Sequence, residues 1–194
     1  MYATRKDFFE KYLDVLDKYV GKLRNRQREL DGLVEKSKDF RKYSQDYIRG
    51  TVKPDIHKIN EEIDSLRTEG VEVITVMCEE YKKQLLSEDA LKGAEITEDA
   101  KLFSSGITLT KEDLDAMLER NKGNRTMVQL VCRFAEEHDI QLNARYVGNT
   151  ETISLISALP KTTEVILKHN GDKMVYENLL GEETLFFKKM SEDK

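Results

Sequence analysis

The first ninety or so residues constrain the fold of this chain most, because apolar side chains recur there at alternating spacings of four and three. On an α-helix this spacing gathers them into one stripe, as in the seam of a coiled coil. The first stripe comprises Phe9, Leu13, Leu16, Val20, Leu23, Leu30 and Val34, and the second comprises Val52, Ile56, Ile59, Ile63, Leu66, Val73 and Met77. The sequence therefore predicts two long amphipathic helices between Thr4 and about Leu86.

The signals for helix ends predict a short break after residue 50. Thr4 with Asp7 can cap the first helix, Gly50 suits the position after its last turn, and Pro54 suits the first turn of the second helix. The stripe falters at Ser37–Arg41, which we interpret as a stammer inside a continuous first helix. Because a short break favours antiparallel neighbours, we expect a helical hairpin.

Folding about that break would bring Gly32 roughly level with Gly70, which suggests a close approach or a bend at that height. The competing arrangement is one continuous rod that forms a parallel dimer. It would require Gly50 and Pro54 to be tolerated inside a helix, which their backbone chemistry disfavours.

Composition and charge agree with long helices that have wide solvated faces. Charged residues make up 36% of the chain and aromatic residues 8%, against about 25% charged residues in an average globular protein. Residues 1–50 carry 13 Lys/Arg and 9 Asp/Glu, whereas residues 51–92 carry 6 and 10. Opposite charge on adjacent helices favours their pairing, and a net charge of −5 argues against nucleic acid as a partner.

No arrangement of residues in the sequence indicates catalysis. The three histidines, His57, His138 and His169, have no metal-ligand spacing, and the two cysteines, Cys78 and Cys132, form no CxxC pair. Phosphate-binding glycine motifs are absent. We therefore expect a protein that is not an enzyme and that needs no cofactor or metal. Without a signal peptide or a membrane-length apolar run, we expect it in the bacterial cytoplasm or in a virion.

The interruptions of the pattern predict three segments: a hairpin over residues 4–88, a linker over 89–109 and a small helical domain over 110–191. In the last segment, Thr110 and Asn124 can cap two short helices separated by Gly123, and Thr150 opens a third. Residues 162–180 fit either a helix that ends at Gly171 or a β-hairpin with a turn at Asn170-Gly171, and we favour the helix. The predicted fold class is all-α.

One stretch at the start of the last segment resembles a known group of proteins. Leu109-Thr110-Lys111-Glu112-Asp113-Leu114, Asn121-Lys122-Gly123-Asn124-Arg125-Thr126-Met127-Val128 and Phe134-Ala135-Glu136-Glu137-His138 follow one another. This pattern, over about residues 109–138, resembles small helical structural or head-assembly proteins encoded by bacteriophages and prophages of Gram-positive hosts. The resemblance implies a virion or head-morphogenesis role and no catalytic residues.

The leading functional prediction is a structural or assembly protein that acts through protein–protein contacts. Phe8, Tyr12, Val15 and Tyr19 widen the apolar face of the first helix beyond what one partner helix can bury. This face requires either the C-terminal segment or a second chain. We predict that it forms the contact of a homo-oligomer, with other virion or assembly proteins as further partners and no membrane.

Two alternatives remain open. Residues 110–140 have the dimensions of a helix-turn-helix, and Arg125, Gln129 and Arg133 share one stripe that could contact DNA. The acidic residues that follow, Glu136, Glu137 and Asp139, would be repelled by the DNA phosphates, so we favour a small helical bundle. The other alternative is a chaperone-like or adaptor protein that clamps a client with its hairpin.

Overall fold

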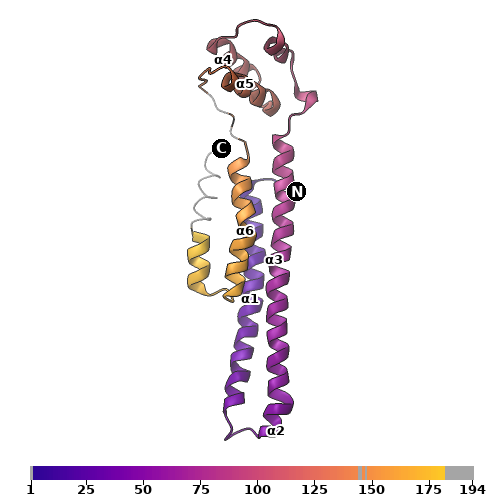
Figure 1. Ribbon diagram of the computed structural model, residues 1–194, viewed down its shortest axis with the longest axis vertical. Helices are drawn as coiled ribbons and strands as arrows, with labels where there is room; N and C mark the ends of the chain where they lie inside the picture. Colours follow the sequence, from indigo (N-terminus) through magenta and orange to yellow (C-terminus); the bar gives the residue numbers. More distant parts are fainter. Residues whose placement is uncertain (1, 144–145, 147, 182–194) are drawn as a thin grey trace. The chain divides into compact units, whose positions relative to one another are not determined.

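The computed structural model describes residues 2–143, 146 and 148–181, and it confirms an all-α fold, without a strand among those residues (Figure 1). The long elements are α1 (Arg5–Lys38), α3 (Lys53–Asp89) and α6 (Thr150–Lys168). The shorter elements are α2 (Gln45–Tyr47), a π-helical turn η1 (Ile48–Val52), 3-10 segments η2 (Gly93–Glu95) and η3 (Glu98–Ser104), α4 (Lys111–Arg120), α5 (Arg125–Glu137) and helical residues 173–181.

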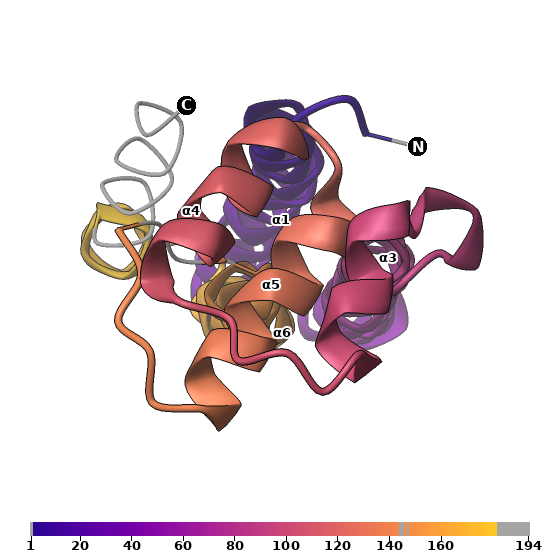
Figure 2. The same cartoon turned by 90° about the horizontal axis from the view of Figure 1, so that it is seen from above.

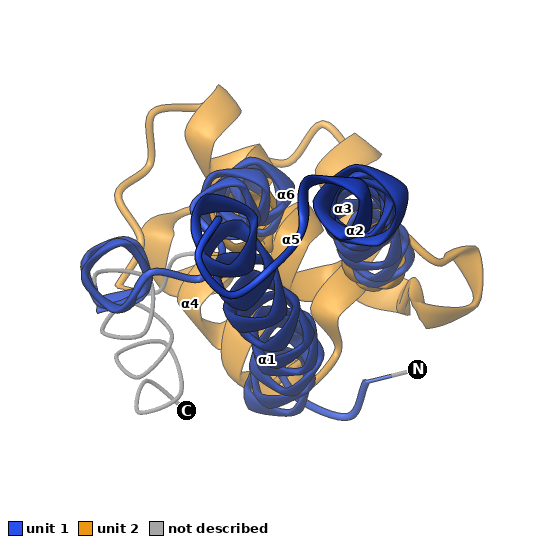
Figure 3. Cartoon of the chain, turned by 90° about the horizontal axis from the view of Figure 1, so that it is seen from below, with its two compact units in different colours: residues 1–82, 154–194 blue, residues 83–153 orange. Residues whose placement is uncertain are grey.

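The chain forms two compact units, which differ from the three segments expected from the sequence (Figure 3). The first unit combines residues 1–82 with 154–194, and the second comprises residues 83–153. The chain therefore leaves the hairpin and then returns to it, so that residues 154–181 pack with α1 and α3 rather than with α4 and α5. The last residues of the expected 110–191 domain, from 182 onward, lie outside the described residues.

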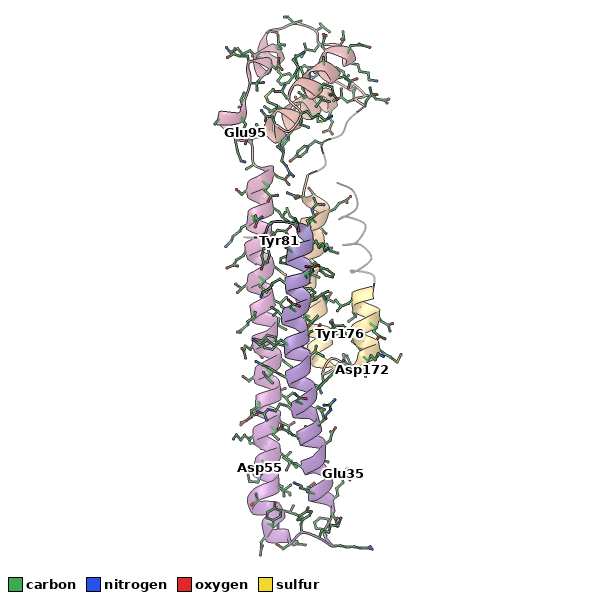
Figure 4. All side chains as sticks on the ribbon, turned by 180° about the vertical axis from the view of Figure 1, so that it is seen from behind. Glu35, Asp55, Tyr81, Glu95, Asp172 and Tyr176 are labelled. Carbon is green, nitrogen blue, oxygen red and sulfur yellow. The ribbon has the colours of Figure 1, made fainter. Side chains whose placement is uncertain are left out.

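The first unit contains the predicted antiparallel hairpin, and its register is set by contacts between α1 and α3. The Phe8 and Tyr81 rings stack with centroids 4.4 Å apart, and the Tyr19 hydroxyl donates to Glu69 Oε1 at 2.8 Å. Arg26 Nε lies 3.0 Å from a Glu62 carboxylate oxygen. Figure 4 shows Tyr81 at one end of this pair of helices and Glu35 and Asp55 towards the other.

The turn of the hairpin lies at residues 39–44, so the predicted break at Gly50–Pro54 is wrong. Helix α1 ends at Lys38, and the Asp39 carboxylate accepts the backbone N–H groups of Arg41 and Lys42, each at 3.3 Å. Ser44 then caps the next helix through the Tyr47 N–H. The faltering stripe at Ser37–Arg41 is therefore the end of the first helix and not a stammer inside it.

Gly50 and Pro54 lie inside a continuous helical stretch because a π-helical turn accommodates them. Proline has no N–H to donate, and its ring crowds the carbonyl four residues before it, here that of Gly50. In η1 the Lys53 N–H donates to the carbonyl of Ile48, five residues earlier. This wider turn displaces the backbone where a regular α-helix would meet the proline ring.

The shifted turn also changes the register of the glycines. Gly32 has no neighbouring atom within 4 Å of the position of a Cβ, so the expected pairing of Gly32 with Gly70 is wrong. Gly70 instead faces α6 and α1: a Cβ there would lie 2.6 Å from Leu167 Cδ1 and 3.1 Å from Tyr19 Cγ. Gly70 thus permits three helices to approach closely.

Helix α6 completes a three-helix core over the part of the hairpin that lies away from the turn. The Tyr12 and Thr163 hydroxyls lie 3.3 Å apart in the buried interior. The core side chains come from all three helices and include Phe8, Tyr12, Leu16, Leu23, Ile63, Ile74, Cys78, Tyr81, Ile156, Leu159, Ile166 and Leu167. Burial of this set, at about 1.5–3 kcal/mol for each large side chain, is the main source of stability of the unit.

The end of α6 confirms the helical prediction for residues 162–180. Asn170 and Gly171 adopt left-handed conformations, with φ values of 52° and 64°, and end the helix. Both long helices hold this turn: Arg24 donates to the Gly171 carbonyl, and Arg67 Nη2 donates to Asn170 Oδ1 at 3.0 Å. Helical residues 173–181 follow, and the Tyr176 hydroxyl donates to the Asp17 carboxylate (Figure 4).

The second unit is built on α4 and α5, which lie side by side (Figure 2). Thr110 and Asp113 form the expected capping box of α4, and Asn124 caps α5. The unit's core comprises Leu109, Leu114, Met117, Leu118, Val131, Cys132 and Ala135. The expected linker 89–109 is partly structured, because η2 and η3 bind α5: Thr126 Oγ1 donates to Glu95 at 2.7 Å, and the Phe103 and Phe134 rings stack.

Candidate functional site

The N-terminal apolar face, predicted to contact a second chain, is covered by the chain itself. Tyr12 has no exposed surface, Phe8 and Tyr19 are buried, and Val15 is half-buried. Helix α6 and Tyr81 of α3 supply the missing surface. This corrects the prediction that these residues form the contact of an oligomer. The sequence left open whether the C-terminal segment or a second chain covers this face, and in the structure the C-terminal segment covers it.

The second set of predicted site residues does not form an exposed stripe for reading DNA. Gln129 is only 8% exposed, and with its amide oriented to satisfy both neighbours it donates to the Asp89 carbonyl and accepts from Arg133. Arg125 is half-buried and donates to the Asp89 carboxylate and, at 3.1 Å, to the Tyr146 hydroxyl. Only Arg133 is exposed. Two of the three side chains therefore serve the internal packing of the second unit.

Asp89, the last residue of α3, is the centre of this polar network. Besides Arg125, its carboxylate accepts the Tyr146 hydroxyl at 2.8 Å and the Asn149 backbone N–H at 2.7 Å. The Asn149 side chain also donates to the Leu85 carbonyl at 3.1 Å, which satisfies one of the carbonyls at the end of the helix. The network thus joins the end of α3, the start of α5 and the segment before α6.

The chemistry available around this network is limited. An open cavity of about 540 Å³ beside it is lined by apolar side chains such as Leu86 and Ile153 and by polar ones such as Arg133 and Glu136. Cys132 also lines it, but burial raises the pKa of its thiol, and burial likewise raises the pKa of the Tyr146 phenol. Both groups are therefore held protonated at neutral pH, which makes the thiol a poor nucleophile.

Among the described residues of the first unit, the turn end of the hairpin is a surface that α6 leaves uncovered. Within the first unit, neither α6 nor the helical residues 173–181 lie beside this part of α1 and α3 (Figure 1). Leu30, Val34, Ile56 and Ile59 of the two stripes are only half-buried there, whereas Leu16, Val20, Leu23 and Ile63 are buried. Ile48 and Val52 are buried next to the turn itself. The side chain of Phe40 is 65% exposed and that of Tyr47 is 42% exposed.

We call residues 36–53 the hairpin tip, because they form the turn and the two helix ends next to it. Six cations and two carboxylates give the tip a net charge of +4: Lys36, Lys38, Arg41, Lys42, Arg49, Lys53, Asp39 and Asp46. Three aromatic side chains are interleaved with them, and the rings of Tyr43 and Tyr47 stack with centroids 5.6 Å apart. The hairpin tip therefore combines positive charge with exposed aromatic surface.

Sequence reasoning missed this surface because it placed the residues around Ser37–Arg41 inside a continuous first helix. The signal that could have found it is the cluster Ser44-Gln45-Asp46, which has the composition of a helix start. A helix start at residue 44 implies a turn just before it, and side chains in a turn are exposed.

Neither a metal site nor a membrane span is found in the described part of the chain. No three His, Cys, Asp or Glu side chains come close enough there to hold an ion. None of the described helices combines the length and apolarity that crossing a membrane requires. Comparison of the chain with protein-family models, with curated proteins and with solved structures found no match.

Proposed function

We propose that this chain is a non-enzymatic structural or assembly protein, and that it acts through protein–protein contacts made by the hairpin tip. The observation that carries the proposal is the uneven covering of the hairpin: α6 packs against one part of α1 and α3, whereas Phe40 and Tyr47 at the turn end remain exposed. Exposed aromatic side chains and arginines are the residues that contribute most to protein–protein binding.

The polar side chains of the second unit support a non-enzymatic role, because they are engaged in holding the fold. Asp89, Arg125 and Tyr146 bind one another, and Thr126 and Asn124 hold the 3-10 segment η2. An active site instead needs polar groups that face a substrate. We therefore advance the assembly role and not a hydrolytic or transfer reaction.

The proposed setting is a bacteriophage particle or its assembly, which rests on the resemblance of residues 109–138. In the structure the resembling residues are helix caps, such as Thr110 and Asn124, and core positions, such as Leu114 and Val128. The resemblance therefore concerns how the second unit folds. The DNA-binding alternative is not advanced, because Arg125 and Gln129 are held inside the second unit.

A photo-cross-linking experiment in the native host tests the proposal. A photoreactive amino acid replaces Phe40 in one variant and Met174, which is 72% exposed on residues 173–181, in the control variant. We expect protein adducts at position 40 that persist in purified particles, and few adducts at position 174. Equal labelling at the two positions, or no protein adduct at position 40, would contradict a contact surface at the tip.

A further inference from the structure

We propose that the partner of the hairpin tip is a second copy of this chain, and that the tip of one copy binds the acidic end of α4 and α5 in the next copy. This inference rests on the proposed function and identifies the partner. Phe40 supplies the apolar part of the contact and the cations of the tip supply the charge. The contact joins two different surfaces. A pair of copies therefore retains one unbound tip and one unbound acidic end.

The charge of the chain is divided in a way that suits self-association. The hairpin tip carries +4, and because the whole chain carries −5, the remainder carries −9. Charges of opposite sign on separate surfaces attract copies of the same chain to one another and speed their encounter. An extended polyanion such as a nucleic acid would be attracted by the tip but repelled by the rest of the molecule.

The second unit provides an acidic surface of the required kind. We call it the acidic end, and it consists of Glu112, Asp115, Glu136, Glu137 and Asp139. Asn143 binds the α4 side of this surface, because it accepts from Lys111 at 3.0 Å and donates to Asp115 at 3.1 Å, and it lines the same hollow as Glu136 of α5. Within the described residues none of these five carboxylates forms an ion pair, and four of them are exposed. They are therefore available to cations from outside the chain.

The same surface contains a hollow that fits an aromatic side chain. Its volume is about 440 Å³, and Ala135, Ile140 and Leu142 give it an apolar lining. Glu136 and Asn143 lie at its polar side. The hairpin tip has the complementary arrangement, with the exposed Phe40 next to Lys38, Arg41 and Lys42. An apolar side chain next to cations thus meets a hollow that has apolar side chains on one part of its lining and the Glu136 carboxylate on another.

A contact between two different surfaces has a definite consequence for assembly. Each copy has one tip and one hollow of this kind, so a pair retains one free tip and one free hollow. Further copies add until the rotation between neighbours closes a ring, or without limit if it does not. Open-ended association of this kind is what a structural protein of an extended particle requires.

Charge reversal in the full-length chain tests the inference by sedimentation velocity. One variant carries Arg41→Glu with Lys42→Glu in the tip, and a second carries Glu136→Lys with Glu137→Lys at the acidic end. The wild type should form oligomers whose mass rises with concentration, and about 0.5 M salt should weaken them at least tenfold. Each variant alone should remain monomeric. Phe40→Ala should weaken the association about tenfold.

Mixing the two variants gives the sharpest outcome. The tip of the second variant and the hollow of the first are intact, so the mixture should form a 1:1 heterodimer and stop there. Combining all four substitutions in one chain should keep it monomeric, because they bring the net charge of the tip from +4 to 0 and that of the acidic end from −5 to −1. The matched control is Lys11→Glu with Lys18→Glu, two exposed cations of α1 outside the tip, which should associate as the wild type does.

Several results would overturn the inference. They are a wild type that remains monomeric at several hundred micromolar, variants that associate like the wild type, or a mixture without heterodimer. Binding of single-stranded DNA or of phosphatidylserine vesicles by a monomeric wild type through its tip would also do so. Circular dichroism of each variant checks that it folds. If the chain is monomeric but Phe40 still cross-links to another protein in the host, only the choice of partner fails and the proposed function stands.

Discussion

At the scale of single residues, two glycines at similar positions along helices have opposite consequences. Gly70 has α1 and α6 against it, with Leu167 Cδ1 2.6 Å from where a Cβ would lie, whereas Gly32 faces open space. The same substitution at the two positions therefore separates the effect of packing from the intrinsic preference for helix.

We predict that Gly70→Ala lowers the free energy of unfolding by about 1–3 kcal/mol, since the added methyl group overpacks the three-helix contact. Gly32→Ala should raise it by about 0.5–1 kcal/mol, because alanine favours a helix interior. Urea denaturation of the two variants and of the wild type measures both changes in the free energy of unfolding. Equal effects at the two positions would show that α6 does not lie against Gly70.

A second residue-scale prediction concerns Tyr19, whose pKa is raised to about 12 by burial and by its hydrogen bond to Glu69. In the unfolded chain a tyrosine ionises near pH 10. The unfolded state therefore loses this proton first, so the contribution of Tyr19 to stability is complete below pH 10 and is lost as pH rises to about 12. Tyr19→Phe should make the loss of stability over this range less steep.

The measurement is the urea midpoint at several pH values between 8 and 11.5, together with the absorbance of tyrosinate. The variant should lose one late-ionising phenol from the titration curve. Tyr43→Phe serves as the control, because Tyr43 lies in the hairpin tip. A titration that keeps the late phenol in Tyr19→Phe would contradict the assignment.

At the scale of elements, the position of the hairpin turn is the most informative difference between sequence and structure. Two seams with a regular spacing predicted two helices correctly. The turn itself, residues 39–44, contains neither glycine nor proline, whereas Gly50 and Pro54 lie in a helix that a π-turn adapts to them. Local sequence signals failed there because a π-helical turn accommodates the Pro54 ring, and the residue types alone do not specify such a turn.

The Ser44 cap tests this turn. We predict that Ser44→Ala lowers the free energy of unfolding by about 0.5–2 kcal/mol, because the Tyr47 N–H loses its acceptor. Thr51 would be the cap if the turn lay at Gly50–Pro54, but in the structure it is an exposed residue of η1. Thr51→Ala should therefore leave stability within about 0.5 kcal/mol of the wild type. A larger loss at Thr51 than at Ser44 would place the turn at residue 50.

The packing of α6 on the hairpin also lay beyond what a sequence pattern can predict. Thr163 meets Tyr12 and Asn170 meets Gln27, although more than 140 residues separate the partners. Periodicity showed that both helices have apolar faces, but it does not specify which faces pair. The contact surface that we propose at the tip depends on where α6 ends, so it could be proposed only after that packing was known.

At the scale of the whole molecule, the account assigns different roles to the two parts of the hairpin. The part beside α6 is a buried core, and the positively charged hairpin tip is the contact surface that we propose. The sequence predicted that the apolar face of residues 8–19 must be buried by a further surface. In the structure α6 of the same chain buries it, and no second chain is required. What remains for contact with other proteins is the end of the hairpin that α6 does not reach.

Hydrogen–deuterium exchange of the full-length chain at low and high concentration tests this assignment most directly. At low concentration, amides around residues 8–23 should exchange slowly and those of residues 36–53 rapidly, because local openings are easiest where little apolar surface is buried. At high concentration, protection should increase in residues 36–53 and in residues 112–143, and residues 8–23 should not change. Rapid exchange of residues 8–23 at low concentration, with protection that appears on association, would contradict the account.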